Sequence, residues 1–149
     1  MYIRDMTEHD YSVVASIYEE AFQYSSGLLE CYYKKYNEYL QFCSNQGYAF
    51  VLEDEGQICG VIIGYEKPDM HRGKVLYIEM IAILSSKRGK GFGKALLAAM
   101  EDRARENGLV EVALRTKCYM DAYMIYNHLG YIDSQDDQRY MTKYIGNKK

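Results

Sequence analysis

The sequence predicts an α/β (α+β) protein whose elements follow the order β-α-α-β-β-β-α-β-α-β. Short apolar runs of strand length lie between segments whose apolar residues recur at helical spacing. The composition of the 149 residues, 48% hydrophobic and 26% charged, is typical of a globular protein. The chain has no internal repeat, linker or low-complexity stretch, and Pro68 is its single proline. One domain over residues 1–149 is therefore expected.

The first third of the chain is expected to hold a short strand and two helices. Residues 1–4 resemble a strand, and Thr7 and Asp10 resemble a cap before a helix with an apolar face. The second helix is expected in the tyrosine-rich residues 28–42. An aromatic core face is the simpler interpretation of this helix, and hydroxyl groups that line a substrate pocket are the alternative. The residues at helical spacing are Leu29, Tyr32, Tyr33, Tyr36 and Leu40.

The central part of the chain is expected to form the sheet. Residues 74–84 are apolar on both faces except for Glu79 and the first lysine, which is typical of a strand in the middle of a sheet. The other expected elements are a hairpin at 47–53 and 57–65, a helix at 92–106, a strand at 109–116, a helix that ends at Gly130, and a closing strand at 139–145.

Charge and cysteine usage exclude several classes of function. The net charge is -3, so no overall basic field attracts nucleic acid, and no nucleic-acid partner is expected. The cysteines Cys31, Cys43, Cys59 and Cys118 form no CxxC pair and no cysteine–histidine cluster, so we expect reduced thiols and no metal site. The N-terminus is polar and no apolar run could span a bilayer, so a cytoplasmic protein without membrane contact is expected.

Residues 85–100 begin with cations and glycines and continue as helix-forming sequence. Glycines before a helix let an anion approach its unpaired N–H groups, and Lys87, Arg88, Lys90 and Lys94 would add positive charge. The segment therefore predicts a pyrophosphate site, with a solvated turn as the alternative. A Walker loop is excluded because Arg and Ala stand at positions 88 and 95. A dinucleotide fingerprint is incomplete because Leu96 replaces its third small residue.

Two motifs carry a resemblance to a known family. Residues 88–93 have the form Arg-x-x-Gly-x-Gly between an expected strand and an expected helix. Farther along, Ala122 and Tyr126, four residues apart, precede Gly130 and Tyr131. In this order and separation, the motifs resemble those of the GCN5-related N-acetyltransferases, the GNAT family. The resemblance extends over most of the chain and implies the GNAT fold, a mixed central sheet of about six to seven strands flanked by about four helices.

The resemblance implies an acyltransferase of EC 2.3.1 type that moves an acetyl group from acetyl-CoA to a primary amine by direct attack through a tetrahedral intermediate. The pyrophosphate of acetyl-CoA would lie on the backbone amides of residues 88–94, and the pantetheine along residues 81–83. Tyr119 stands where many members have an asparagine that contacts the pantetheine, and whether Tyr119 replaces this contact is left open. The implied cofactor-binding residues are Ile81, Ala82, Ile83, Arg88, Gly89, Lys90, Gly91, Phe92, Gly93, Lys94, Tyr119 and Tyr126.

Tyr126 and Glu79 are the expected catalytic residues. Tyr126 matches the family tyrosine that protonates the departing thiolate, and a phenol is a neutral donor at pH 7. Packing alone is the alternative for Tyr126. Glu79 lies on a strand among apolar residues, whose desolvating effect should strengthen it as a base, acting directly or through water. Its alternatives are exposure to solvent or binding of a cationic acceptor, and a strand bulge would change the face to which it points.

The motifs do not specify the acceptor. Asp133, Asp136 and Asp137 make one loop acidic, which hints at a polyamine, an aminoglycoside or a lysine-bearing peptide, although solvated loop charge is the simpler interpretation. The expected partner is a small-molecule or peptide amine, and a homodimer is left open. Two alternatives remain for the function. One is an acetyl-CoA-binding sensory or regulatory module without transfer activity, and the other is a protein acetyltransferase that acts within a complex.

Overall fold

The computed structural model describes residues 1–22, 33–116, 121–133, 141, 143, 144 and 146. The chain divides into two compact units, Met1–Arg115 and Thr116–Lys149, and each unit is described by itself. Among the described residues, no helix combines the length and the apolar character needed to cross a membrane.

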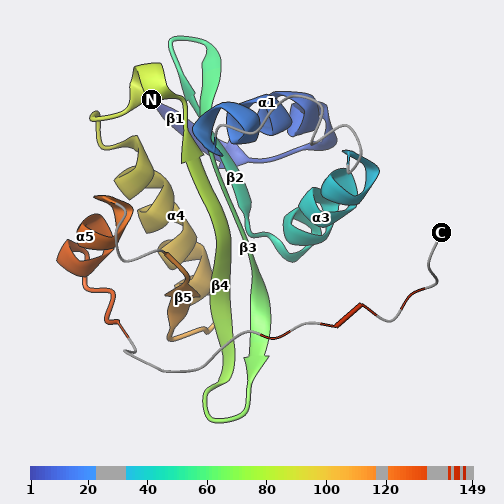
Figure 1. Cartoon of the computed structure of the whole chain (residues 1–149). Helices are drawn as coiled ribbons and strands as arrows, with labels where there is room; N and C mark the ends of the chain where they lie inside the picture. The colour runs from blue at the N-terminus through green and yellow to red at the C-terminus, as the bar shows by residue number, and fades with distance from the viewer. Residues whose placement is uncertain (23–32, 117–120, 134–140, 142, 145, 147–149) are drawn as a thin grey trace. The chain divides into compact units, whose positions relative to one another are not determined.

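The first unit is built on a mixed five-stranded sheet in the order β1-β2-β3-β4-β5 (Figure 1). Its strands are β1 (Tyr2–Asp5), β2 (Ala49–Asp54), β3 (Gln57–Asp69), β4 (Gly73–Ile83) and β5 (Val112–Leu114). Neighbours from β1 to β4 are antiparallel, whereas β5 pairs with β4 in parallel. The strand that the sequence predicted for the middle of the sheet, β4, lies between β3 and β5, as its apolar faces require.

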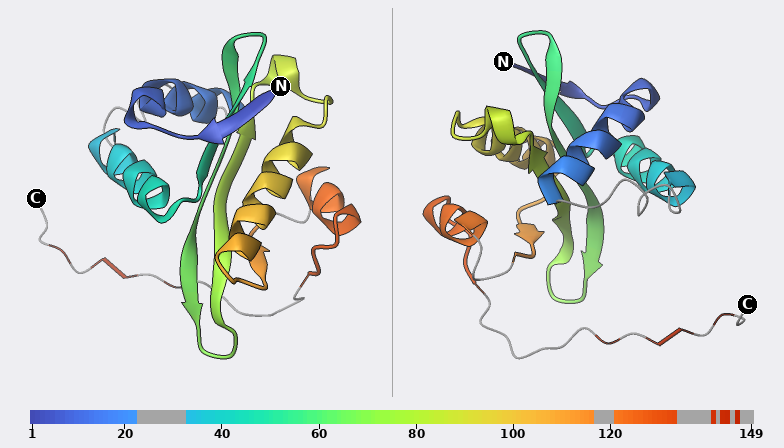
Figure 2. Two further views of the ribbon diagram at one scale, coloured as in Figure 1. Left: turned by 180° about the vertical axis from the view of Figure 1, so that it is seen from behind. Right: turned by 45° about the horizontal axis from the view of Figure 1, so that its top comes forward.

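Helices cover both faces of this sheet. Helices α1 (Tyr11–Phe22) and α3 (Tyr33–Gln46) lie on one face, and α4 (Phe92–Glu106) lies on the other (Figure 2). The second unit contains α5 (Asp121–His128). The predicted second helix is confirmed from residue 33 onward, and residues 28–32 of that prediction lie outside the described residues.

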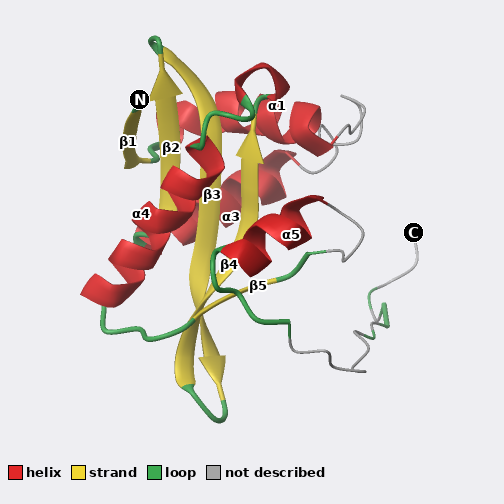
Figure 3. Ribbon diagram, turned by 90° about the vertical axis from the view of Figure 1, so that its left-hand side faces the viewer, coloured by secondary structure: helices red, strands yellow, loops and turns green. Residues whose placement is uncertain are grey.

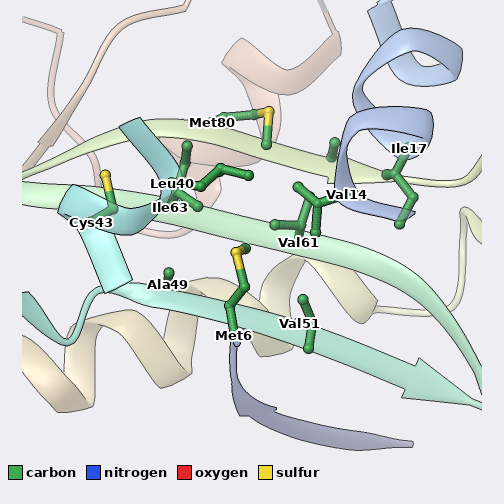
Figure 4. Packing of buried hydrophobic residues seen from close by; sticks show 11 residues of the cluster. Met6, Val14, Ile17, Leu40, Cys43, Ala49, Val51, Val61, Ile63 and Met80 are labelled. Carbon is green, nitrogen blue, oxygen red and sulfur yellow. The ribbon is translucent and has the colours of Figure 1, made fainter. Parts of the chain in front are cut away.

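A hydrophobic core fills the space between α1, α3 and the sheet (Figure 4). Val14 and Ile17 of α1 and Leu40 of α3 are fully buried against Val61 and Ile63 of β3. Complete burial of one such aliphatic side chain stabilises a fold by about 1.5–3 kcal/mol. Tyr36 packs against this core and Leu40 is buried in it, so the aromatic core face predicted for α3 is confirmed for these two residues. Tyr39, which the prediction did not include, packs against the same core.

The β2–β3 hairpin turns through two left-handed residues, Glu55 (φ 53°) and Gly56 (φ 76°). Asp54 pairs with Gln57, so the loop has two residues, which is the connection that matches the twist of the flanking strands. A glutamate is uncommon at a positive φ. Glu55 therefore has a strained backbone conformation in the tight turn of this hairpin.

Strand β4 carries a bulge at Glu79. Ile63 pairs with Met80 and Gly64 pairs with Ile78, which leaves Glu79 as the extra residue. A Cβ on Gly64 would lie 2.6 Å from the Tyr77 carbonyl oxygen, so a larger residue would force the two strands apart at this point. The bulge interrupts the alternation of side chains that a strand otherwise imposes.

The sequence predicted six to seven strands, and the described residues form five. In the predicted closing strand 139–145, the described residues Met141, Lys143 and Tyr144 are not in a strand, and the others lie outside the described residues. Met141 is 87% exposed and Tyr144 is 77% exposed, so this segment lacks the burial that stabilises a strand with alternating apolar residues. Strand β5 is shorter than the strand predicted at 109–116. Strand β3 is longer than the strand predicted at 57–65 and includes Pro68.

Candidate functional site

The segment between β4 and α4, residues 84–91, is here named the glycine loop (Figure 3). It contains a 3-10 turn at Ser85–Lys87 and left-handed glycines at Gly89 (φ 80°) and Gly91 (φ 81°). Gly91 is the N-cap of α4, and its carbonyl accepts a bond from Ala95 N–H at 3.0 Å. The N–H groups of residues 92–94 precede this first intrahelical donor and therefore point out of the helix start, where an anion binds.

The space over the glycine loop is open to an anion. A Cβ built on Gly89, Gly91 or Gly93 would meet no atom within 4 Å. The side chains of Lys90 and Lys94 are exposed beside these glycines. Bare backbone, a helix N-terminus and two exposed lysine side chains are features that bind anions, and the pyrophosphate site that the sequence predicts here stays a prediction.

Two of the four predicted cations contact the protein that surrounds the loop. The ammonium of Lys87 lies 3.2 Å from Oδ2 of Asp54 and 3.2 Å from Oε2 of Glu55, and these hydrogen bonds raise the pKa of Lys87. The guanidinium of Arg88 donates from Nε to the Ile83 carbonyl at 3.2 Å. The expectation is corrected for Lys87, whose charge is paired with two carboxylates of the hairpin. Arg88 is exposed and bonds an uncharged carbonyl, so its contribution of charge to an anion site stays a prediction.

The edge of β4 next to the loop has the geometry to receive an extended ligand. Strand β5 pairs with β4 only from Leu76 to Ile78. The Leu84 N–H donates to β3, so by antiparallel alternation the polar groups of Ile81 and Ile83 point to the opposite edge. The Arg88 bond to the Ile83 carbonyl agrees with that direction. Ile81 and Ile83 therefore present backbone N–H groups along which a pantetheine could add like a further strand, whereas the polar groups of Ala82 face β3.

Glu79 lies next to tyrosine side chains of α3 and β4 and is exposed to solvent. This exposure overturns the expectation that apolar neighbours bury the carboxylate, and the bulge is the physical reason, because it removes Glu79 from the alternation of β4. Burial raises the pKa of Tyr39, and the charge of Glu79 and a side-chain hydrogen bond with it raise that pKa further. Burial and the Glu79 charge also raise the pKa of Tyr77, and the Arg115 charge opposes this increase in part.

Four aromatic side chains form a continuous set, named here the aromatic row: Tyr39 and Phe42 of α3, Tyr65 of β3 and Tyr77 of β4. The Tyr65 ring centroid lies 6.3 Å from Tyr39, 6.0 Å from Phe42 and 5.5 Å from Tyr77. Sequence patterns did not predict this row as a functional feature. Tyrosine enrichment was a signal, but the contacts depend on the pairing of Tyr65 with Tyr77 across the β3–β4 hairpin.

In the second unit, Tyr126 lies on α5 and is half-buried, and burial raises its pKa. Its ring centroid is 5.9 Å from that of Tyr131, whose N–H donates to the Tyr126 carbonyl at 3.0 Å. Gly130, at φ 92°, provides the reversal that this contact needs. The Asp133 carboxylate accepts a bond from the Tyr123 hydroxyl at 2.9 Å. Tyr119, Asp136 and Asp137 lie outside the described residues.

Known proteins resemble this chain in sequence. A family model described as the acetyltransferase (GNAT) family matches residues 12–131. N-alpha-acetyltransferase 30 of Schizosaccharomyces pombe is 36% identical over 87 residues, which cover 56% of this chain and 57% of that protein. L-2,4-diaminobutyric acid acetyltransferase of Nocardia farcinica is 31% identical over 72 residues, which cover 48% of this chain and 36% of that protein. The chain spans about half the length, or less, of the curated relatives that it matches.

Solved structures resemble the chain over nearly its whole length. AAC(6')-Iy in complex with the bisubstrate analogue CoA-S-monomethyl-acetylneamine has a TM-score of 0.77 at 19% identity, covering 96% of this chain and 98% of that one. This likeness shows the fold, and the family model, which matches most of the chain, shows the family. The chain belongs to the acetyltransferase (GNAT) family.

Proposed function

We propose that this protein is an N-acetyltransferase that moves an acetyl group from acetyl-CoA to a primary amine. The observation that carries the proposal is the open space over Gly89 and Gly91 of the glycine loop and over Gly93 at the N-terminus of α4. This loop directly follows Ile83, at the end of the β4 edge that has the geometry for a pantetheine. The family match from residue 12 to residue 131 runs through both compact units, which supports one acetyltransferase domain over residues 1–149.

The proposed reaction begins when the neutral amine nitrogen attacks the thioester carbonyl carbon. A C–N bond forms, the C–S bond breaks, and the amine loses one proton while the thiolate gains one. We assign the first proton transfer to Glu79, directly or through water, because its carboxylate is exposed on β4 two residues before Ile81. The Ile81 N–H is assigned to the carbonyl oxygen, where a fixed dipole stabilises the negative charge that develops.

Tyr126 is the proposed general acid that donates a proton to the thiolate. Burial raises the pKa of this phenol, which keeps it protonated at neutral pH and therefore able to donate. The match of Ala122, Tyr126, Gly130 and Tyr131 to the second family motif supports the assignment. Tyr119 is retained as a proposed contact of the pantetheine.

The acceptor class remains an amine in this proposal. The printed names of relatives include an N-alpha-acetyltransferase and a diaminobutyric acid acetyltransferase, so peptide N-termini and small diamines are the first acceptors to test. The second candidate function is a sensory module that binds acetyl-CoA without transfer. The family match supports this sensory module as well, since a protein can bind acetyl-CoA without binding an acceptor amine.

The test measures thiol release from acetyl-CoA with a panel of diamines, polyamines, aminoglycosides and peptides, and mass spectrometry identifies the product. Tyr126→Phe and Glu79→Gln should each lower kcat at least about tenfold, as expected for the loss of a general acid or base. Tyr123→Phe, on the same helix, and Glu101→Gln, on α4, are the matched controls and should retain activity. If protein that binds acetyl-CoA releases no thiol with any acceptor, the transferase proposal is rejected and the sensory module is favoured.

A further inference from the structure

The aromatic row is partly exposed, which core packing alone does not explain. Phe42 is 48% exposed, and Tyr39, Tyr65 and Tyr77 are half-buried. Aromatic side chains that only complete a core tend to bury their rings, because each ring carries a large apolar area. The row instead presents ring surface beside β4, on the sheet face that α3 covers.

A cation already occupies one ring of this row. The ammonium of Lys67 lies over the Tyr77 ring, 5.4 Å from its centroid, within the range of a cation–π contact. Lys67 and Tyr77 face each other because Lys67 pairs with Val75, two residues from Tyr77, on the neighbouring strand. The protein thus shows, with its own side chain, that the Tyr77 ring accepts an alkylammonium group.

A carboxylate lies at the same place. The charge of Glu79 acts on both Tyr39 and Tyr77, whose rings each contact the ring of Tyr65. The Glu79 side chain is exposed, so a ligand can approach it from solvent. Ring faces and one exposed carboxylate together form the combination that binds an organic cation in preference to an anion or a neutral molecule.

We propose that the aromatic row and Glu79 form a binding site for the alkylammonium group of the acceptor. The proposal rests on the proposed function and specifies its substrate class, an amine that arrives protonated on an apolar alkyl chain. This ammonium releases one proton to water before its neutral nitrogen attacks the thioester. Tyr77 and Tyr65 contact the chain and the cation through their ring faces, and Glu79 neutralises the charge. Lys67 occupies the site in the absence of acceptor and moves away when the acceptor binds.

Tetramethylammonium is the probe for this site because it is a cation with an apolar surface that can neither lose a proton nor be acetylated. Binding is followed by protein NMR, on tyrosine ring signals, in the absence of acetyl-CoA. Tyr77→Phe should bind the probe like the natural protein, whereas Tyr77→Leu should lose about two- to fivefold in affinity, the effect of one exposed cation–π contact. Glu79→Gln should also weaken binding.

Lys67→Met gives a change of opposite sign, since it removes the competing cation from the Tyr77 ring. The probe should bind about two- to fivefold more tightly. Lys35→Met, which removes one exposed lysine from α3, is the matched control for general electrostatics and should leave the affinity unchanged. Both lysines are exposed, so these variants are expected to fold even if Tyr77→Leu does not.

The outcomes separate this inference from the proposed function. The aromatic site is overturned if Lys67→Met and Lys35→Met change the affinity for the probe equally. It is also overturned if Tyr77→Leu binds the probe as tightly as the natural protein does. Acetyl transfer by a protein that does not bind the probe supports the function and overturns the inference. Probe binding with the expected variant pattern supports the site even when no acceptor releases thiol, in which case only the transferase proposal fails.

Discussion

The ammonium nitrogen of Lys87 lies 3.2 Å from Oδ2 of Asp54, and this contact attaches the glycine loop to the tip of the β2–β3 hairpin. The Lys87 side chain is only 12% exposed, so it is largely enclosed by its partners. At the start of the same loop, Ser85 donates its N–H to Glu20 of α1 at 3.0 Å, and its hydroxyl donates to the same carboxylate. Carboxylates from two elements thus hold the loop in place before any anion binds, which reduces the ordering cost of binding.

Asp54→Asn should weaken acetyl-CoA binding, although it removes a negative charge close to an anion site. The reason is that the variant removes one of the two carboxylates that hold Lys87 and loosens the loop, and we expect a loss of about two- to fivefold in affinity by calorimetry. Lys87→Met should cause a similar loss, and the double variant should lose no more than either single variant. Glu101→Gln is the control, since it removes one carboxylate about 14 Å along α4 from Phe92. Tighter binding by Asp54→Asn would show that Lys87 is a phosphate ligand instead.

Gly93→Ala should separate stability from cofactor binding. A methyl group at this position meets no protein atom and improves helix propensity, so the free energy of unfolding should stay the same or rise by up to about 1 kcal/mol. The same methyl group enters the space assigned to the pyrophosphate, so affinity for acetyl-CoA should fall about tenfold. Thermal unfolding and calorimetry measure the two effects.

Gly91→Ala is the companion variant for this test. Its backbone is left-handed at φ 81°, so an alanine there should cost about 1–2 kcal/mol of stability. Both variants should lose cofactor affinity, whereas only Gly91→Ala should lose stability. Natural affinity in Gly93→Ala would place the pyrophosphate elsewhere.

The buried Arg4–Asp10 pair should make stability sensitive to acid. Asp10 is 4% exposed and accepts two bonds from Arg4, at 2.8 and 2.9 Å, and one from the Thr7 N–H. The hydrogen bond from Arg4 lowers the pKa of Asp10 below its usual value, with the Thr7 bond and the Arg4 charge adding to it. A lowered folded pKa stabilises the protein above the unfolded pKa of about 3.9, and this stabilisation is lost as the pH falls through the folded pKa.

Asp10→Asn should therefore reduce the free energy of unfolding at pH 7 by about 2–3 kcal/mol, less than for a fully buried pair because Arg4 stays partly exposed. The difference from the natural protein should shrink as the pH falls from about 4 toward 2. Urea unfolding across this range is the measurement. Asp102→Asn breaks the exposed Arg105 pair and should change stability by less than about 1 kcal/mol, and a pH-independent loss in Asp10→Asn would argue against linkage.

The Cys43 thiol should be unreactive in the folded protein. It is fully buried, and burial together with the Glu79 charge raises its pKa to about 12. Because the thiolate is the reactive form, iodoacetamide at pH 8 should label Cys43 only after unfolding. Peptide mapping by mass spectrometry distinguishes Cys43 from the other cysteines. Rapid labelling of Cys43 without denaturant would mean that α3 opens locally on the timescale of the reaction.

The periodicity and motifs of the sequence determined most of the fold and predicted where a cofactor would bind. Helical spacing in α4, the apolar faces of β4 and the turn residues of the hairpin all depend on contacts between near neighbours in the chain. The glycine loop was recognised for the same reason, since its glycines and the helix that follows are adjacent in sequence. The predicted closing strand had similar alternation, but Met141 and Tyr144 are exposed, and alternation alone does not provide a partner strand.

Only the tertiary structure decided the surroundings of the individual side chains. Lys87 and Asp54 are 33 residues apart, so no local pattern could show that this cation holds the loop in place. The exposure of Glu79 follows from a bulge that is defined by the register of β3 against β4, and the aromatic row depends on the same register. Spacing along a chain encodes which residues share the face of one element, whereas register and ion pairing arise only when separate elements pack together.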